Sequence, residues 1–275
     1  MAYRSILTYF DGDDASEDRM QAAIAVTRQM DAHLTALAIG YDPNIPPYAY
    51  GEAAGAVMAE LVEAAQSDAD ARVAIANGMI EKAGILGDAQ PVVCRYGAFS
   101  REFGDYAQFS DLVVLTRPYG ADLPRTAADA FEGALFDGAA AVLVCPPEMD
   151  AIDTGTVLVA WNGSRESLRA VRRAMPFLEA ASAVELMMVD PPSSERAPGE
   201  QLATLLSRHG IPVVINAQPK SPESITDVLD RRVGELGAGL LVMGGYGHSR
   251  FREYVIGGVT RDILADSRIP ILMAH

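Results

Sequence analysis

The second half of the chain alternates short apolar runs with longer amphipathic stretches. The apolar runs are rich in Val, Leu, Ile and Met, and they predict strands at residues 156–161, 183–189, 212–216, 239–243 and 270–274. The stretches between them predict helices at residues 165–178, 200–209, 222–236 and 257–267. Strands that are apolar on both faces and alternate with helices are typical of a parallel sheet covered on both sides. Right-handed crossovers then favour a doubly wound sheet.

Two of these helices carry further local signals. The helix predicted at residues 165–178 has one apolar stripe at steps of three and four residues, formed by Leu168, Val171, Met175 and Leu178. The helix predicted at residues 222–236 begins with Pro222, because proline is tolerated in a first turn and the preceding Ser221 can cap it.

The first half of the chain repeats the pattern of the second. Residues 6–12 match residues 157–163, and both are apolar runs that end in an Asx-Gly turn. Residues 112–120 align with residues 239–247 without a gap. This is a tandem duplication, and it predicts an α/β protein with two doubly wound, five-stranded parallel-sheet domains.

The predicted domain boundaries follow from where the apolar pattern stops and restarts. The domains are predicted at residues 1–147 and 153–275, joined by a proline-containing polar linker. The last apolar run of each half, at residues 140–145 and 270–274, can pair with the other inside one chain. That pairing would make the chain an intramolecular pseudo-dimer, and a further homodimer of whole chains stays open.

Composition narrows the classes of partner. The chain has 275 residues, of which 49% are hydrophobic, and a formal net charge of −15. Such a charge repels nucleic acids and anionic membrane surfaces. No apolar run approaches the roughly 18 residues of a membrane span, and the chain starts without a secretory signal, so we expect a cytoplasmic protein with neither kind of partner. Cys94 and Cys145 lie in apolar runs and are predicted to be buried thiols.

The segment from Met243 to Thr260 is the most informative motif. Its glycines at 244, 247 and 257 allow the backbone to turn at a strand end, pass round a group and open a new helix. The free amides and the dipole of a helix start favour an anion, so the segment predicts a phosphate-binding loop. In a doubly wound sheet the ligand crevice lies where the winding reverses, which would set this loop opposite the turn at Asn162.

The spacing Gly-x2-Gly-x9-Gly, followed by a small residue, Val and Thr, resembles the nucleotide loop of the universal stress protein family. The resemblance extends over essentially the whole chain as a tandem pair of domains with the adenine nucleotide alpha hydrolase-like fold. It implies a regulatory stress-response protein that binds ATP or a related adenine nucleotide, with or without Mg, in the second domain. An unknown protein partner is implied as well.

The resemblance also assigns the residues of the site. Those that end the first, second and fourth strands of the second domain, and those of the loop, would surround the nucleotide: Ala160, Trp161, Asn162, Met188, Met243, Gly244, Gly247, Gly257, Gly258, Val259 and Thr260. His248 also lies on the loop, where it could approach the phosphates or face solvent. Arg261, in the first turn of the last helix, could reach phosphate or form a surface ion pair.

Two positions depart from the family pattern. Gly258 stands where nucleotide-binding members usually have Ser or Thr. A hydrogen bond to a charged group contributes roughly 1.5–3 kcal/mol, so its loss would weaken binding by about one or two decades without abolishing it. Asn162 stands where Asp is common. Its side chain can accept from a ribose hydroxyl and can also donate, which changes preference more than it removes the site.

The first domain carries a degenerate version of the loop. Arg117 replaces the first glycine, Pro118 follows it, and the nine-residue step from Gly120 reaches Ala130. We therefore interpret this domain as one that has lost nucleotide binding and serves as a scaffold or a partner surface, although Arg117 could itself pair with phosphate. Residues 41–50, rich in Tyr and Pro, precede a long Ala-rich helix that ends near residue 83. They form either a docking surface or a loop packed on its own domain.

Enzyme classes find little support. The only two lysines, Lys82 and Lys220, are not in a Walker loop, and Phe251 occupies the second glycine position of a nucleophile elbow. The four histidines have no metal-ligand spacing, and residues 161–164 lack the Ser-Gly-Gly loop of adenylating enzymes. No general base is evident, so any ATP hydrolysis would be slow.

The alternative function is that of a protein-interaction module without nucleotide. The retained glycines at 244, 247 and 257 argue against it, because simple packing is expected to require none of them.

Overall fold

The computed structural model describes residues 2–42, 54–95, 97–120, 122–191, 199–219, 222–245 and 258–275. The strands of the first half are β1 (Ser5–Phe10), β2 (His33–Asp42), β3 (Leu86–Arg95), β4 (Leu112–Thr116) and β5 (Val142–Cys145). Its helices are α1 (Ser16–Met30), α2 (Ala54–Ala83), α3 (Phe99–Ala107), α4 (Arg125–Glu132) and the π-helix η3 (Gly133–Asp137).

The second half repeats this order of strands and helices. Its strands are β6 (Thr156–Ala160), β7 (Ala183–Val189), β8 (Val213–Gln218), β9 (Leu240–Gly244) and β10 (Ile271–Ala274). Its helices are α5 (Arg165–Arg173), α6 (Met175–Ala180), α7 (Glu200–Arg208), α8 (Ile225–Leu236) and α9 (Gly258–Asp266). All five strands predicted here are found within two residues of the predicted bounds.

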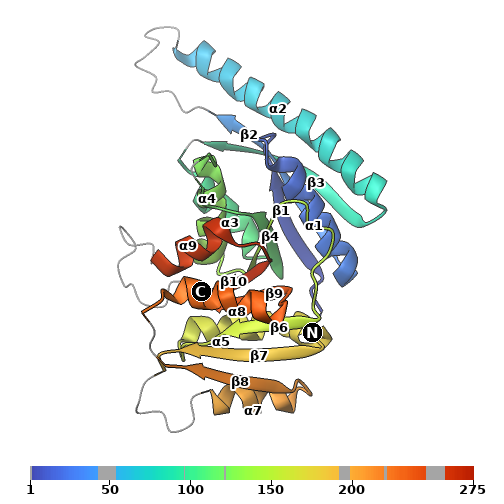
Figure 1. The fold of residues 1–275 in the computed structure, drawn as a ribbon. Coiled ribbons are helices and arrows are strands. Elements are labelled where there is room, and N and C mark those ends of the chain that lie inside the picture. The colour runs from blue at the N-terminus through green and yellow to red at the C-terminus, as the bar shows by residue number, and fades with distance from the viewer. Residues whose placement is uncertain are drawn as a thin grey trace.

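Across the described residues, ten strands form one sheet in the order β3-β2-β1-β4-β5-β10-β9-β6-β7-β8 (Figure 1). Within each half, neighbouring strands are parallel. The halves meet where β5 and β10 pair antiparallel, with Leu143 opposite Leu272. The α/β fold class with two five-stranded parallel units is therefore confirmed, and so is the pairing of the last strands inside one chain.

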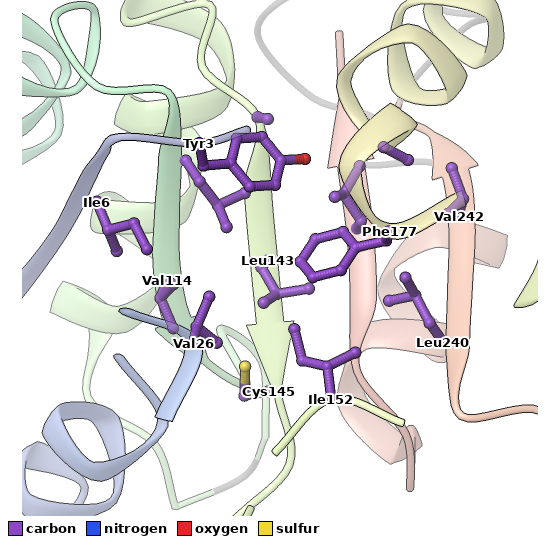
Figure 2. Packing of buried hydrophobic residues seen from close by; sticks show 14 of the residues in the cluster. Tyr3, Ile6, Val26, Val114, Leu143, Cys145, Ile152, Phe177, Leu240 and Val242 are labelled. Carbon is purple, nitrogen blue, oxygen red and sulfur yellow. The ribbon is translucent and has the colours of Figure 1, made fainter. Parts of the chain in front are cut away.

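Helices cover both faces of the sheet, as expected for doubly wound strands. One buried cluster contains residues of α1, α2, α5, α6 and α7, and the other contains residues of α3, α4, α8 and α9. The first cluster continues from one half into the other. Figure 2 shows Tyr3 of the first half facing Phe177 of α6, with ring centroids 5.5 Å apart. Sheet and core are thus continuous, and the domain boundaries at 1–147 and 153–275 stay a prediction.

The linker also packs on the first half. Residues 146–155 form neither helix nor strand, and Ile152 within them is only 3% exposed. The side chain of Gln29 on α1 donates to the Ile152 carbonyl at 3.0 Å and accepts from its amide at 3.1 Å. This double hydrogen bond fixes the linker against α1.

Two predicted helix boundaries were wrong. The helix predicted at residues 165–178 is interrupted at Ala174, because Pro176 in the next turn has no N–H to continue the hydrogen bonds. The helix predicted to begin at Pro222 begins at Ile225. Ser224 is its N-cap: the Ser224 hydroxyl accepts from the Asp227 amide at 3.0 Å and donates to the Asp227 carboxylate at 2.7 Å.

Both thiols lie where the sequence predicted. Cys94 is 1% exposed and Cys145 is fully buried, and both cysteines are free. In the described part of the chain, no helix is both long and apolar enough to cross a membrane.

Candidate functional site

The turn that follows β6 is open to solvent. The Asn162 side chain accepts a hydrogen bond from the Ser164 amide at 3.1 Å, and Gly163 adopts a positive φ of 76°. Ser164 then caps α5 by accepting from the Ser167 amide at 3.1 Å. Asn162 and Gly163 are exposed, and no described atom lies within 4 Å of where a Cβ on Gly163 would stand. The sequence thus builds a turn with free space beside it.

The strands β6 and β9 bring two of the predicted site residues together. Ala160 at the end of β6 pairs in register with Met243 on β9, so the two strands end side by side. This is where the winding of the second half reverses, as predicted. Met243 is 7% exposed and Trp161 is half-buried. Met188 on β7 is 2% exposed and lies beside Gly199 at the start of α7.

The helix α9 begins at Gly258, next to the predicted phosphate loop. Its third residue, Thr260, is buried with 7% exposure. Gly247, His248 and Gly257 lie outside the described residues, and Gly258 and Val259 are described only as helical backbone. The structure thus places the strand ends and the helix that flank the loop.

Packing explains one of the three loop glycines. A Cβ on Gly244 would stand 2.4 Å from the Ser167 amide nitrogen and 2.7 Å from the Glu166 carbonyl carbon, in the first turn of α5. Backbone atoms cannot yield as a flexible side chain does, so Gly244 is required by the contact between β9 and α5. The assumption that packing requires none of the three glycines is therefore wrong for Gly244.

The equivalent turn of the first half is filled by the chain's own side chains. Arg19 on α1 is fully buried, and its Nη2 lies 2.7 Å from the Asp11 carboxylate and 3.1 Å from the Asp13 carboxylate. The Arg19 Nε donates to the Tyr9 carbonyl at 2.9 Å, and its guanidinium carbon lies 3.6 Å from the Tyr9 ring centroid. The Tyr41 hydroxyl donates to the other Asp11 oxygen at 3.1 Å. Asp11 is thus held by protein groups on both oxygens.

The environment of this network shifts its ionisation. Burial raises the pKa of the Asp13 carboxyl. The charge of Arg19 and the hydrogen bonds from Ser16 and Arg19 lower it by more, so the pKa lies below its usual value. Burial and the nearby Asp11 raise the pKa of the Tyr41 hydroxyl, which stays protonated and remains a donor to Asp11. The Arg19 pKa is raised despite burial, by Tyr9, Asp11 and Asp13. The network is therefore a charged arginine between carboxylates.

The space beside Gly12 is also occupied. Gly12 has the same positive φ, 76°, as Gly163, but the Nε of Arg72 would lie 3.0 Å from a Cβ placed on it. Arg72 comes from the long helix α2, and its Nη1 donates to the Ile39 carbonyl on β2. The same local turn is thus covered in the first half and open in the second.

Sequence reasoning missed Arg19 and Arg72. The alignment of residues 6–12 with 157–163 has an offset of 151 positions, so it pairs Arg19 with Ala170. A buried alanine matched to an arginine was a usable signal that the two turns differ. Arg72 had no such signal, because the second-half counterpart of α2 is α7, which has only 9 residues and no matching position.

The sequence left the roles of two arginines undecided, and each of them approaches the other half of the chain. The Nη1 of Arg117 lies 3.4 Å from the carbonyl oxygen of Ala265 in the last turn of α9. The guanidinium carbon of Arg261 lies 5.3 Å from the centroid of the Tyr119 ring. Among the described residues, no group of three or more His, Cys, Asp or Glu could hold a metal ion.

The comparison with known proteins finds similar structures. No protein-family model matches the chain. No curated protein is significantly similar to it. A universal stress protein from Archaeoglobus fulgidus DSM 4304 covers 98% of this chain over 95% of its own length, with 16% identity and a TM-score of 0.73. A protein from Pseudomonas aeruginosa UCBPP-PA14, provisionally named a universal stress protein, covers 99% of this chain over 93% of its own, with 19% identity and a TM-score of 0.55.

A universal stress protein solved in complex with cAMP covers 52% of this chain over 97% of its own, with 22% identity and a TM-score of 0.33, which is too low to bear on the ligand of this chain. The two longer likenesses span nearly the whole of both molecules and establish the fold. The chain therefore has the fold of universal stress proteins in a tandem form, with two copies sharing one ten-stranded sheet across the described residues.

Proposed function

We propose that the chain is a regulatory stress-response protein that binds ATP or a related adenine nucleotide in its second half. The observation that carries this proposal is the open turn at Asn162 and Gly163, which follows β6 where that strand ends beside β9. The carboxyl ends of parallel strands, at the point where the winding reverses, are where α/β proteins bind ligands.

The start of α9 and the turn after β6 suit different parts of a nucleotide. The first amides of α9, at Gly258 to Thr260, have no partner inside the helix, and the helix dipole adds positive potential there. These groups favour phosphate. At the end of β6, Trp161 is half-buried and packs against the core, and the exposed Asn162 amide can bond a ribose hydroxyl or a base edge.

The first half is proposed to bind no nucleotide. In its turn, Asp11 is bonded to Arg19 and Tyr41, and the side chain of Arg72 covers Gly12. A ligand would therefore have to displace a buried ion pair. One nucleotide per chain is the expected stoichiometry.

Native mass spectrometry of the freshly purified full chain tests this proposal. One adenine nucleotide per chain, with heat stabilisation by added ATP, would support it. Two nucleotides per chain would contradict the assignment of the first half. Neither bound nucleotide nor stabilisation by ATP would instead favour the protein-interaction module.

Gly247→Val tests the loop itself, with Gly120→Val as the matched control at the aligned position of the first half. The first change should abolish nucleotide binding while the chain stays folded, because a side chain would fill the space of the phosphates. The control should bind as the wild type does. Trp161 is the only tryptophan of the chain, so its fluorescence can report binding. Unchanged affinity in Gly247→Val would count heavily against the phosphate loop.

A further inference from the structure

The C-terminal end of helix α9 is bonded to the first half of the chain. Arg117 follows β4, and its Nη1 reaches the carbonyl oxygen of Ala265, one of the last carbonyls of α9, at 3.4 Å. The final carbonyls of a helix have no intrahelical donor and carry negative potential, so a guanidinium is a favourable partner. Arg117 aligns with Gly244 of the second half. The position that lost its glycine in the first half thus gained a side chain that crosses to the other half.

The first turn of α9 also approaches the first half, through the side chain of Arg261. Arg261, in the first turn of the helix, is exposed and has its guanidinium 5.3 Å from the centroid of the Tyr119 ring. Tyr119 is 6% exposed, and its hydroxyl donates to the Glu132 carboxylate on α4 at 3.2 Å. Burial raises the pKa of the Glu132 carboxyl, whereas its hydrogen bond with Tyr119 and the charge of Arg261 lower it. A buried ring backed by a carboxylate is a suitable platform for a cation.

Gly245, which follows β9, is bonded within the second half and lies near the π-helix η3 of the first half. The Gly245 amide donates to the Ala274 carbonyl at 3.0 Å, and Nδ1 of His275 lies 3.1 Å from the Gly245 carbonyl oxygen. The His275 ring meets Phe136 of η3 edge to face, with centroids 4.9 Å apart. A Cβ on Gly245 would stand 3.1 Å from Leu135, also of η3. Side chains of the first half therefore lie near Gly245 and near Arg261.

We propose that Arg117 and Tyr119 of the first half are positioning residues for helix α9 of the second half, whose first amides belong to the proposed nucleotide site. This inference rests on the proposed nucleotide site and names what regulates it. By fixing α9 at its first and last turns, the first half sets where the free amides of Gly258 to Thr260 point. A helix already held in its binding orientation loses less freedom when the ligand binds, so affinity depends on residues that never touch the ligand.

The test compares Tyr119→Leu with Tyr119→Phe in the full chain. Tyr119→Leu removes the ring under Arg261, whereas Tyr119→Phe keeps the ring and loses only the hydroxyl. We expect Tyr119→Leu to weaken ATP binding by about threefold to tenfold, as for other coupled residues outside a site. Tyr119→Phe should restore most of the affinity. Tyr106→Leu is the matched control, because Tyr106 lies on α3 of the same half and is 40% exposed.

Hydrogen exchange of the nucleotide-free chain provides a second readout that needs no ligand. In Tyr119→Leu and Arg117→Met, the amides of α9 should exchange faster, while those of α1 should keep their wild-type rates. Unchanged exchange in α9 would overturn the positioning role even if ATP binds. Faster exchange in a chain that binds no ATP would leave the positioning intact and refute the nucleotide site instead. If ATP binds and Tyr119→Leu keeps wild-type affinity, the proposed coupling is wrong.

Discussion

The two Asx-Gly turns of the chain share a local conformation and differ in what surrounds them. Gly12 and Gly163 both have a φ of 76°, and both follow the first strand of their half. In the first half, Asp11 is buried at 7% exposure and paired with Arg19, whereas Asn162 of the second half is exposed and bonds only locally among the interactions described. A duplicated motif can therefore become a structural ion pair in one copy and stay an open turn in the other.

The difference depends on residues outside the motif. Arg19 and Arg72 approach the first turn from α1 and α2, and the position that matches Arg19 in the second half is Ala170. An alanine there cannot pair with a side chain of the turn. Asn162 is uncharged and exposed, so it needs no such partner.

The largest expected effect comes from removing the cation of the first turn. Arg19→Met leaves the buried Asp11 carboxylate without its ion-pair partner, and breaking such a pair typically costs about 3–5 kcal/mol. Urea denaturation should show a loss of this size in the free energy of unfolding. Arg172→Met, at an exposed position of α5, is the control and should change it by less than about 0.5 kcal/mol. A small loss in Arg19→Met would mean that the ion pair does not hold the first turn.

Acid should weaken the first turn through Asp13. The folded-state pKa of Asp13 lies below its unfolded value, so its ionisation stabilises the fold above the unfolded pKa of about 4, and that stability is lost as pH falls through the folded value. The effect should be smaller than that of Arg19→Met, because Arg19 and Asp11 stay in place. Urea denaturation between pH 6 and pH 3, taken as a rough range around that pKa, should show a shallower decline for Asp13→Asn. Identical slopes would exclude this contribution.

Gly244→Ala tests whether packing selects that glycine. The new methyl group would overlap backbone atoms of α5, and overpacking of this kind typically costs about 1–3 kcal/mol. Gly78→Ala on α2 is the control, since no described atom lies within 4 Å of its Cβ position and alanine favours a helix by about 1 kcal/mol. Thermal unfolding measures both changes. If Gly244→Ala leaves the stability unchanged, packing does not require this glycine, and ligand binding is the reason for it.

The smallest expected effect is the difference in stability between matched alanine substitutions at the two turns. Gly163→Ala should cost roughly 1–2 kcal/mol, because alanine is disfavoured at positive φ. Gly12→Ala should cost the same amount plus a few tenths of a kcal/mol for moving the flexible Arg72 side chain. Chemical denaturation of the two variants side by side gives the difference. Equal losses would show that Arg72 does not restrict the first turn.

The sequence determined much of the fold by itself. Apolar runs of strand length that alternate with amphipathic helices admit little other than a parallel sheet with helices on both faces, because every apolar face must be buried. The internal alignment predicted a tandem pair, and the last strand of each half was available to join the two sheets. The Asx-Gly turns after β1 and β6 were also visible, since only the chain's local geometry is needed to form them.

Only the tertiary structure decided how each copy of the motif is used. Contacts between residues far apart in sequence place Arg19 and Arg72 against the first turn, set the α5 backbone against Gly244, and carry Arg117 across to α9. Periodicity and spacing describe neighbours along the chain, whereas burial and pairing depend on which elements pack together. The sequence therefore pointed to a turn in each half, and packing filled the first turn while leaving the second open.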